Sequence, residues 1–326
     1  MPRVFAIVGP TASGKSALAM ELAEATGGEI VNADALQVYR GFDIGTAKPS
    51  PEERQRVPHH LVDILDPGAR YSAGEFARRA RAALAEIAAR GRTAILVGGS
   101  GLYLRALWSG IAPLPPVDGA ARAALLERLE REGLGALHAE LARLDPPTAV
   151  RLGPGDTQRI LRALEVAVST GETLTSWIAK QPFGTAPLAM HKVGLTLPRG
   201  LLYDAIAARV QKMLDAGWLE EVRALLVNGV DRSAPAFQAI GYRQWVELLD
   251  GARGFDESLQ TVVTSTRRFA KRQETWFRRE EGIVWWDARR TRDCLLSMME
   301  MPEVAGAEPA KTGGIAEPTG ATGGGG

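Results

Sequence analysis

The chain has 326 residues, of which 45% are hydrophobic and 24% charged, and its formal net charge is +1. These values are typical of a globular protein with room for one large domain and a smaller one, and they exclude a strongly basic chain whose overall field would attract nucleic acid. Its single cysteine excludes an internal disulfide framework, and no apolar run approaches the roughly 20 residues of a membrane span, so we expect a cytoplasmic protein without a membrane segment.

The first predicted elements are a buried strand at residues 4–8 and a helix at 15–26. Between them lies Gly9-Pro10-Thr11-Ala12-Ser13-Gly14-Lys15-Ser16, which matches the phosphate-loop pattern G-x-x-x-x-G-K-[ST] at every fixed position. In such a loop the backbone N–H groups and the lysine bind phosphate oxygens, and the serine hydroxyl can bind Mg²⁺. The loop therefore predicts a ligand that carries a di- or triphosphate.

A carboxylate and a hydroxyl follow the next two predicted strands. Asp34 comes after a strand at 29–31, at the edge of a parallel sheet where ligands bind. It is a candidate general base, and its alternative role is to cap the following turn. A strand at 93–97 ends in Gly98-Gly99-Ser100, where a nucleotide hydrolase would have a carboxylate that helps to hold Mg²⁺. The hydroxyl suggests that pyrophosphate is released as a leaving group, without activation of water.

His59 and His60 are adjacent and could be taken for metal ligands. Neighbouring side chains on an extended segment point to opposite faces, so the two imidazoles cannot easily share one ion. We interpret one as packed and the other as hydrogen-bonded.

Strand patterns alternate with helix patterns over most of the chain. The strands are predicted at 4–8, 29–31, 93–97 and 191–197, and the helices of the same region at 15–26, 73–90 and 201–228. This alternation, together with the phosphate loop, predicts an α/β fold: a P-loop NTPase-like core with a parallel sheet flanked by helices. Between proline-rich segments, only helical spacing is found, at 119–132, 134–144 and 156–170.

The same pattern divides the chain into four segments. They are a first core segment (1–112), an inserted all-α domain (113–187), a second core segment (188–300) and a low-complexity tail (301–326) that we expect to be disordered.

A helix predicted from Val262 to Glu280 carries six cations on one side. At about 100° per residue, they form two adjacent rows: Arg267, Lys271 and Arg278, and then Arg268, Arg272 and Arg279. On the other side, Val262, Phe269 and Trp276 are predicted to pack against the core. A charged row can be a solvated face, but its density here also suggests a track for an RNA backbone, with Arg159 and Arg162 as a second cationic edge.

These residues resemble one family, the tRNA dimethylallyltransferases. The matching segments follow the family order: GPTASGKSALA (9–19), NADALQVYRGFDIGTAKP (32–49), PHHLVDI (58–64), YSAGEFARRA (71–80), LVGGSGLYLRAL (96–107), DTQRILRALEV (156–166), AIGYRQ (239–244) and TRRFAKRQETWFR (266–278). The resemblance implies transfer of a dimethylallyl group from dimethylallyl diphosphate to the exocyclic amino nitrogen of the adenosine 3′ to the anticodon, in tRNAs that read codons beginning with U. It also implies Mg²⁺ as the cofactor, and we expect a monomer.

The resemblance further implies roles for individual residues. Gly9–Ser16 would hold the diphosphate, with Mg²⁺ on Ser16, Asp34 would accept the proton, and Lys15, Ser100 and Arg209 would assist departure of the diphosphate. Contacts to tRNA are implied for Asp34, Ala35, Leu36, Gln37, Ser100, Arg122, Gln158, Arg159, Ile160, Leu161, Arg162, Gly241, Tyr242, Arg243, Gln244, Lys271, Arg272, Gln273, Trp276 and Arg278. The chain departs from many members at Ala35 and Ser100, where they have Ser and Thr, and at Ala205, where an arginine is frequent.

Two other classes of function remain open on the sequence. A small-molecule or nucleotide kinase would share the phosphate loop and a helical lid, but it predicts an acidic residue in place of Gly98-Gly99 and gives no role to the basic helix. A non-catalytic RNA-binding module would leave Asp34 without a role.

Overall fold

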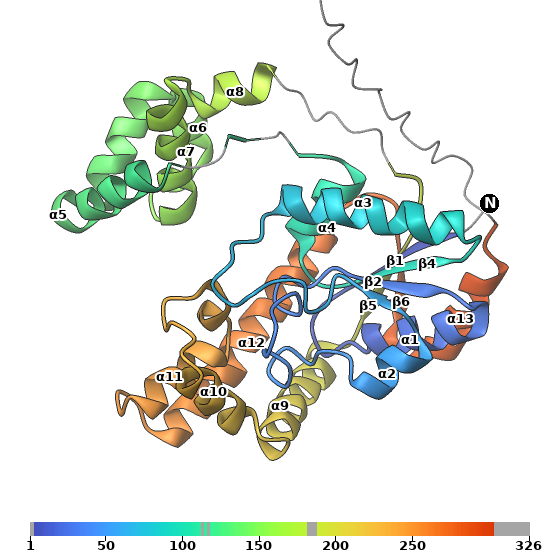
Figure 1. Cartoon of the computed structure of the whole chain (residues 1–326). Helices are drawn as coiled ribbons and strands as arrows, with labels where there is room; N and C mark the ends of the chain where they lie inside the picture. The colour runs from blue at the N-terminus through green and yellow to red at the C-terminus, as the bar shows by residue number, and fades with distance from the viewer. Residues whose placement is uncertain (1–2, 112–113, 116–117, 181–187, 303–326) are drawn as a thin grey trace, which may run out of the picture.

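The computed structural model describes residues 3–111, 114–115, 118–180 and 188–302 (Figure 1). Within these ranges the strands form one six-stranded sheet in the order β3-β2-β4-β1-β5-β6, and each neighbouring pair is parallel. The strands are β1 (Val4–Val8), β2 (Glu29–Asn32), β3 (His59–His60), β4 (Ala94–Val97), β5 (His191–Thr196) and β6 (Ile283–Asp287). The predicted parallel α/β core is confirmed, and the sequence patterns missed the two edge strands, β3 and β6.

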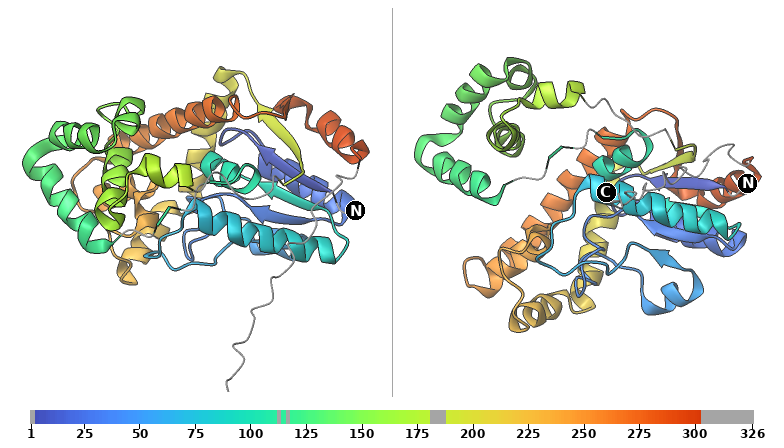
Figure 2. Two further views of the ribbon diagram at one scale, coloured as in Figure 1. Left: turned by 90° about the horizontal axis from the view of Figure 1, so that it is seen from above. Right: turned by 45° about the horizontal axis from the view of Figure 1, so that its top comes forward.

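Both faces of the sheet are covered by helices, which explains the unbroken apolar run of β1. Phe5 and Ile7 pack on one face, in a cluster with α1 (Lys15–Thr26) and α13 (Thr291–Glu300). Ala6 and Val8 point to the other face, in a cluster with α3 (Ala73–Ala89) and α4 (Gly101–Trp108). Figure 2 shows this sheet between its helices in two further orientations.

The predicted helical insertion is a separate lobe in Figure 1. Its helices are α5 (Gly119–Leu144), α6 (Pro146–Arg151), α7 (Thr157–Thr170) and α8 (Leu174–Lys180). They share a core of their own, built mainly from leucines. The predicted ends of α7 are confirmed, because Asp156 caps its first turn by accepting from the Arg159 N–H and Gly171 ends it with φ 71°. Both views of Figure 2 place this lobe at the end of the molecule opposite the N-terminus, on the side toward which β1 runs.

A second helical group follows β5 and packs around its own aromatic core. It contains α9 (Arg199–Asp215), α10 (Trp218–Val227), the short 3₁₀ helix η1 (Pro235–Gln238), α11 (Tyr242–Leu249) and α12 (Phe255–Phe277). The prediction of one helix over 201–228 is wrong, because the chain turns at Gly217, whose φ of 95° suits glycine. The α/β part of the chain also contains two short elements, α2 (Pro51–Arg56) and the 3₁₀ helix η2 (Ala288–Arg290). The expected tail lies, from residue 303 on, outside the described residues.

Among the residues that the structure describes, no helix has the combination of length and apolar character that a bilayer crossing requires.

Candidate active site

The carboxyl ends of three adjacent strands bring the main sequence candidates to one cavity. The phosphate loop follows β1, Asp34 follows β2 and Ser100 follows β4. Thr11, Asp34 and Ser100 line a cavity of about 670 Å³, and its other walls include residues of α4, α9 and α12 and the insertion residue Arg159. The structure therefore brings the phosphate loop, the carboxylate of Asp34 and the hydroxyl of Ser100 together at this edge of the sheet.

The phosphate loop is built to receive an anion. Gly9 packs so closely on β5 that a Cβ atom would lie 2.4 Å from the carbonyl oxygen of Leu195. The Ser13 hydroxyl is 1% exposed and has no hydrogen-bond partner among the described residues. An orphaned buried hydroxyl costs free energy, which a phosphate oxygen would offset.

Lys15 is buried, and its ammonium donates a 2.6 Å hydrogen bond to the carbonyl oxygen of Pro10. Burial and, secondarily, the charge of Arg209 lower the pKa of Lys15 to about 7, while the carboxylate of Asp34 opposes both effects. Burial likewise lowers the pKa of Arg209, again against the influence of Asp34. Within the described part of the chain, these two cations share a desolvated site with the one carboxylate of Asp34, so the site favours additional negative charge.

Asp34 is half-buried and held by its neighbours. Its N–H donates to Asn32 Oδ1 over 3.0 Å, and its Oδ1 accepts from the N–H of Leu36 over 2.8 Å. Both predicted roles are therefore compatible, because one oxygen caps the turn and Oδ2 has no donor among the described residues. The carboxylate is oriented, and one of its oxygens remains available as a base.

Ser100 is tied to the Asp34 segment. Its Oγ accepts a 3.1 Å hydrogen bond from the N–H of Ala35, which leaves the O–H proton available for an oxygen in the cavity. The flanking glycines have a steric reason, since a Cβ atom on Gly99 would lie 2.0 Å from Gln273 Nε2 and one on Gly101 would lie 2.3 Å from Trp276 Cδ1. The packing against α12 therefore leaves no room for a carboxylate at position 99.

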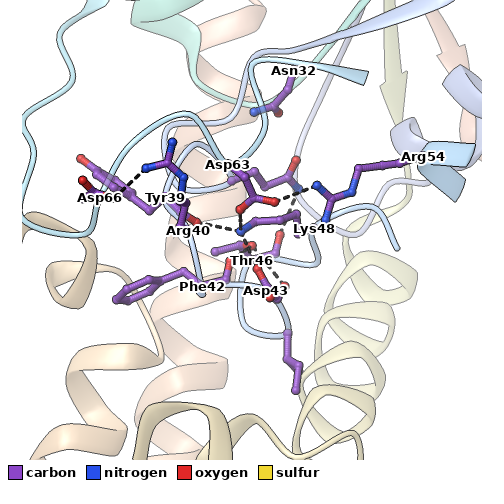
Figure 3. Close-up of polar contacts among 12 residues, drawn as sticks. Asn32, Tyr39, Arg40, Phe42, Asp43, Thr46, Lys48, Arg54, Asp63 and Asp66 are labelled. Atoms are coloured by element: carbon purple, nitrogen blue, oxygen red, sulfur yellow. Dashed lines mark hydrogen bonds and ion pairs between the residues drawn. The ribbon is translucent and has the colours of Figure 1, made fainter. Parts of the chain in front are cut away.

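The segment after Asp34 is folded around one buried ammonium group (Figure 3). The Lys48 side chain is 1% exposed and donates to the carbonyl oxygen of Tyr39 at 2.7 Å and to Asp43 and Asp63 at 2.5 Å each. Asp63 also accepts from Arg54 at 2.7 Å. Burial works to raise the pKa of Asp63, but the hydrogen bonds from Lys48 and Arg54 bring it below its usual range.

The carboxylate of Glu221 fixes this segment to the second helical group. Glu221 of α10 accepts from the N–H groups of Asp43 and Ile44 at 2.9 and 2.7 Å, and from the hydroxyl of Tyr242 at 2.6 Å. Residues 34–37 therefore belong to a segment that is anchored on both sides. Gln37 lies within it and donates to the carbonyl oxygens of Thr46 and Ala47.

The basic helix α12 is present, but its buried face differs from the prediction. Val262 is buried as expected, whereas Phe269 is 36% exposed and lines the cavity together with the half-buried Trp276. The remaining buried residues of this half of the helix, Ala270, Gln273 and Phe277, are centred roughly 70° away from the predicted face. Trp276 packs against the core cluster as predicted and also lines the cavity, so Phe269 is the residue that departs from the prediction.

The cations of α12 divide into exposed and packed groups. Lys271, Arg272 and Arg278 are exposed, and Arg272 lines the cavity. Arg278 also pairs with Glu274 at 2.9 Å. Arg267 does not belong to an open row, because its guanidinium lies 5.0 Å from the ring centre of Tyr203 on α9.

Several residues assigned to tRNA have buried side chains. Tyr242 and Gln244 are 0% and 2% exposed, and Gln244 Oε1 accepts from the N–H of Gly241. In α7, Ile160 and Leu161 are part of the lobe's core. These four side chains are packed within the fold, which does not fit the predicted side-chain contact to RNA, whereas their neighbours Arg243, Gln158 and Arg159 are exposed.

Two other arginines of the lobe are engaged within it. Arg122 pairs with the buried Glu165 at 2.5 Å, and Arg162 donates to the carbonyl oxygen of Pro115 at 2.9 Å. The histidine interpretation is partly confirmed, since both rings are hydrogen-bonded: His59 Nδ1 to the carbonyl oxygen of Val57 and His60 Nε2 to Glu29.

The sequence patterns missed part of the cavity wall. Met213, Trp218 and residues 238–240 line it from the second helical group. Trp218 follows the Gly217 break, and its indole Nε1 is buried without a partner among the described residues. Gly217 was the signal in the sequence that could have revealed this wall, because a glycine within an apolar helical pattern marks a possible change of direction of the chain.

Comparison with known proteins identifies the family. The family model described as IPP transferase matches residues 37–280. The tRNA dimethylallyltransferase of Geobacter metallireducens is 48% identical over 295 residues, which cover 90% of this chain and 96% of the relative. This chain belongs to the IPP transferase family. The tRNA dimethylallyltransferase of Methylococcus capsulatus is similarly 48% identical, over 87% of this chain and 92% of that protein.

Solved structures of IPP transferases have the same architecture. The tRNA isopentenylpyrophosphate transferase of Bacillus halodurans has a TM-score of 0.66 and 36% identity, over 92% of this chain and 96% of that one. A eukaryotic dimethylallyltransferase acting on tRNA has a TM-score of 0.74 and 26% identity, over 92% of this chain and 77% of that one. This IPP transferase is therefore a prenyltransferase enzyme, and the kinase alternative is not favoured.

Proposed function

We propose that this IPP transferase moves a dimethylallyl group from dimethylallyl diphosphate to the exocyclic amino nitrogen of the adenosine 3′ to the anticodon, in tRNAs that read codons beginning with U. The observation that carries the proposal is the single cavity that joins a phosphate loop, an oriented carboxylate and the exposed arginines 159 and 272. The printed names of the relatives support tRNA as the acceptor. We place the enzyme in the cytoplasm as a monomer.

The reaction is a substitution at the first carbon of the allyl group. The amino nitrogen forms the new N–C bond while the C–O bond to diphosphate breaks, and Asp34 Oδ2 accepts the proton that the nitrogen loses. Lys15, Arg209 and the Ser100 hydroxyl neutralise the charge that develops on the leaving oxygen. The partly apolar cavity limits access of water, which would otherwise hydrolyse the allylic diphosphate.

The acceptor base has to leave its stack to reach this cavity. Flipping a nucleotide costs a few kcal/mol, and the cost is lower in a single-stranded loop. The exposed side chains of Arg159, Arg243, Lys271, Arg272 and Arg278 would hold the RNA backbone around the opening. The Arg105 guanidinium covers one face of the Trp276 ring, 4.4 Å from its centre, which leaves the other face for stacking of a base in the cavity.

The residues fit Mg²⁺ as a partner of the diphosphate. The described ranges contain no cluster of three or more His, Cys, Asp or Glu side chains that could hold a metal ion by themselves. Mg²⁺ often binds through one protein oxygen and substrate phosphates, and the exposed Ser16 at the start of α1 supplies such an oxygen. When bound there, Mg²⁺ would neutralise charge on the diphosphate.

The donor is tested by incubating the protein with total tRNA, Mg²⁺ and dimethylallyl diphosphate, with and without ATP. We expect a nucleoside whose mass has increased by one dimethylallyl group in both reactions, because the donor already carries its leaving group. Product that forms only when ATP is added would contradict this account of the phosphate loop.

A further inference from the structure

Gln273 of α12 connects the two loops that hold the reacting groups. Its side chain is 6% exposed. Oε1 accepts a 2.8 Å hydrogen bond from the N–H of Thr11 in the phosphate loop, and Nε2 donates a 3.0 Å hydrogen bond to the carbonyl oxygen of Gly99, the residue before Ser100. One amide therefore joins segments that are 262 and 174 residues away in the sequence.

The chemistry of this contact requires a primary amide. One loop offers a donor and the other an acceptor, and a glutamine side chain presents an acceptor and a donor on one planar group. A carboxylate would have no proton for the Gly99 oxygen, and an apolar side chain would leave two buried backbone groups unpaired. The missing Cβ of Gly99 is what lets Nε2 approach, since a Cβ atom there would lie only 2.0 Å away.

Gln273 connects α12, which carries exposed cations, to the loops that surround the proposed diphosphate site. Its helix carries the exposed Lys271 and Arg272 on the preceding turn and the cavity-lining Trp276 on the next. The Gln273 amide lies on the buried side of the same helix and contacts the phosphate loop at Thr11. A shift of α12 would therefore move both loops.

We propose that Gln273 is a positioning residue: it sets the separation between the phosphate loop and Ser100, and it transmits the position of the RNA-bearing helix α12 to the reaction centre. This inference rests on the proposed function and replaces the assignment of Gln273 as a tRNA contact. Gln273 lines the cavity, but both of its side-chain hydrogen bonds are to the backbone of Thr11 and Gly99, and it acts through them.

The test compares Gln273→Met with Gln260→Met. Gln260 is an exposed glutamine of the same helix, about 20 Å away along its axis, so the chemical change is matched outside the site. The readouts are the single-turnover rate constant of prenyl transfer at saturating substrates, the Kd for tRNA and the unfolding temperature. A displacement of about 1 Å can cost as much as 100-fold in rate. We expect Gln273→Met to lower the rate constant by about 10- to 100-fold with the Kd for tRNA changed by less than about threefold.

Gln273→Glu is the second variant, because it keeps the size of the side chain and the acceptor for Thr11, loses the donor to Gly99 and places a negative charge against the Gly99 carbonyl oxygen. Its rate constant should also fall by at least about tenfold, with the Kd for tRNA changed by less than about threefold. An unchanged rate constant with a weaker Kd for tRNA would show a direct RNA contact and overturn the inference. A lower unfolding temperature with unchanged rate and Kd would reduce Gln273 to a structural role and also overturn it.

The activity of the wild type distinguishes a failure of the proposed function from a failure of the positioning role of Gln273. Absence of prenyl transfer by the wild type and by Gln260→Met would refute the proposed function. Transfer by both, and equally by the two Gln273 variants, would refute the positioning role alone.

Discussion

Replacing Lys48 with methionine tests whether the segment that carries Asp34 is organised by one buried charge. Methionine retains most of the length of the side chain and removes the ammonium group, and with it three hydrogen bonds at 2.7, 2.5 and 2.5 Å. Removing one partner of a fully buried ion pair typically costs about 3–5 kcal/mol. Here the side chains of Asp43 and Asp63 are 56% and 28% exposed, so water can replace part of the interaction. We therefore expect a loss of about 2 kcal/mol, below the range for a fully buried pair.

The assay is equilibrium unfolding in urea, with Arg40→Met as the control. Arg40 lies in the same segment and pairs with Asp66 at 2.6 Å, but the two side chains are 57% and 80% exposed. Such a surface pair contributes between about 0 and 1 kcal/mol, so its loss should lower the free energy of unfolding only slightly. An effect of Lys48→Met no larger than that of Arg40→Met would refute the reasoning.

Two further predictions concern RNA and acid stability. Changing both Lys271 and Arg278 to Glu should weaken tRNA binding and reduce the slope of log K against log salt concentration by roughly one for each lost phosphate contact. Binding titrations at several salt concentrations measure this, and parallel lines for the wild type and the variant would mean a merely solvated face. Hydrogen bonds from Arg90 and, secondarily, His60 hold the pKa of the buried Glu29 below its model-compound value of 4.5. Their stabilisation is present above that pH and is lost as the pH falls below it, so Glu29→Gln should be less stable than the wild type at pH 6, and urea unfolding at pH 3.5 should show a smaller difference.

The sequence was sufficient where a local pattern coincides with a tertiary constraint. The phosphate loop, the position of Asp34 after β2 and the helical lobe were all predictable, because each depends on residues close together in the chain. The strands β3 and β6 were missed since β3 has only two residues and β6 is an edge strand, with Val284 51% exposed.

The rest of the site depends on packing between distant segments, which periodicity does not reveal. The face of α12 was misplaced because the deciding contact is polar: Gln273 is buried by its hydrogen bonds to Thr11 and Gly99. A hydrophobic pattern gives such a residue no weight and selects Phe269 in its place. Likewise, no hydrophobic pattern indicates that the Lys48 ammonium is buried, because its three partners, Tyr39, Asp43 and Asp63, are brought together by the turns of the chain on both sides of it.

Single-turnover transfer by Asp34→Asn tests the central claim most directly. The amide preserves the shape of the side chain and its acceptor for the Leu36 N–H, but it cannot take up the proton of the adenine amino group. General-base catalysis typically contributes about 10²–10⁴-fold. We expect a loss of that size in the rate of dimethylallyl transfer, with the Kd for tRNA within a few-fold of the wild type. A loss of less than about tenfold would contradict the assignment of Asp34 as the base.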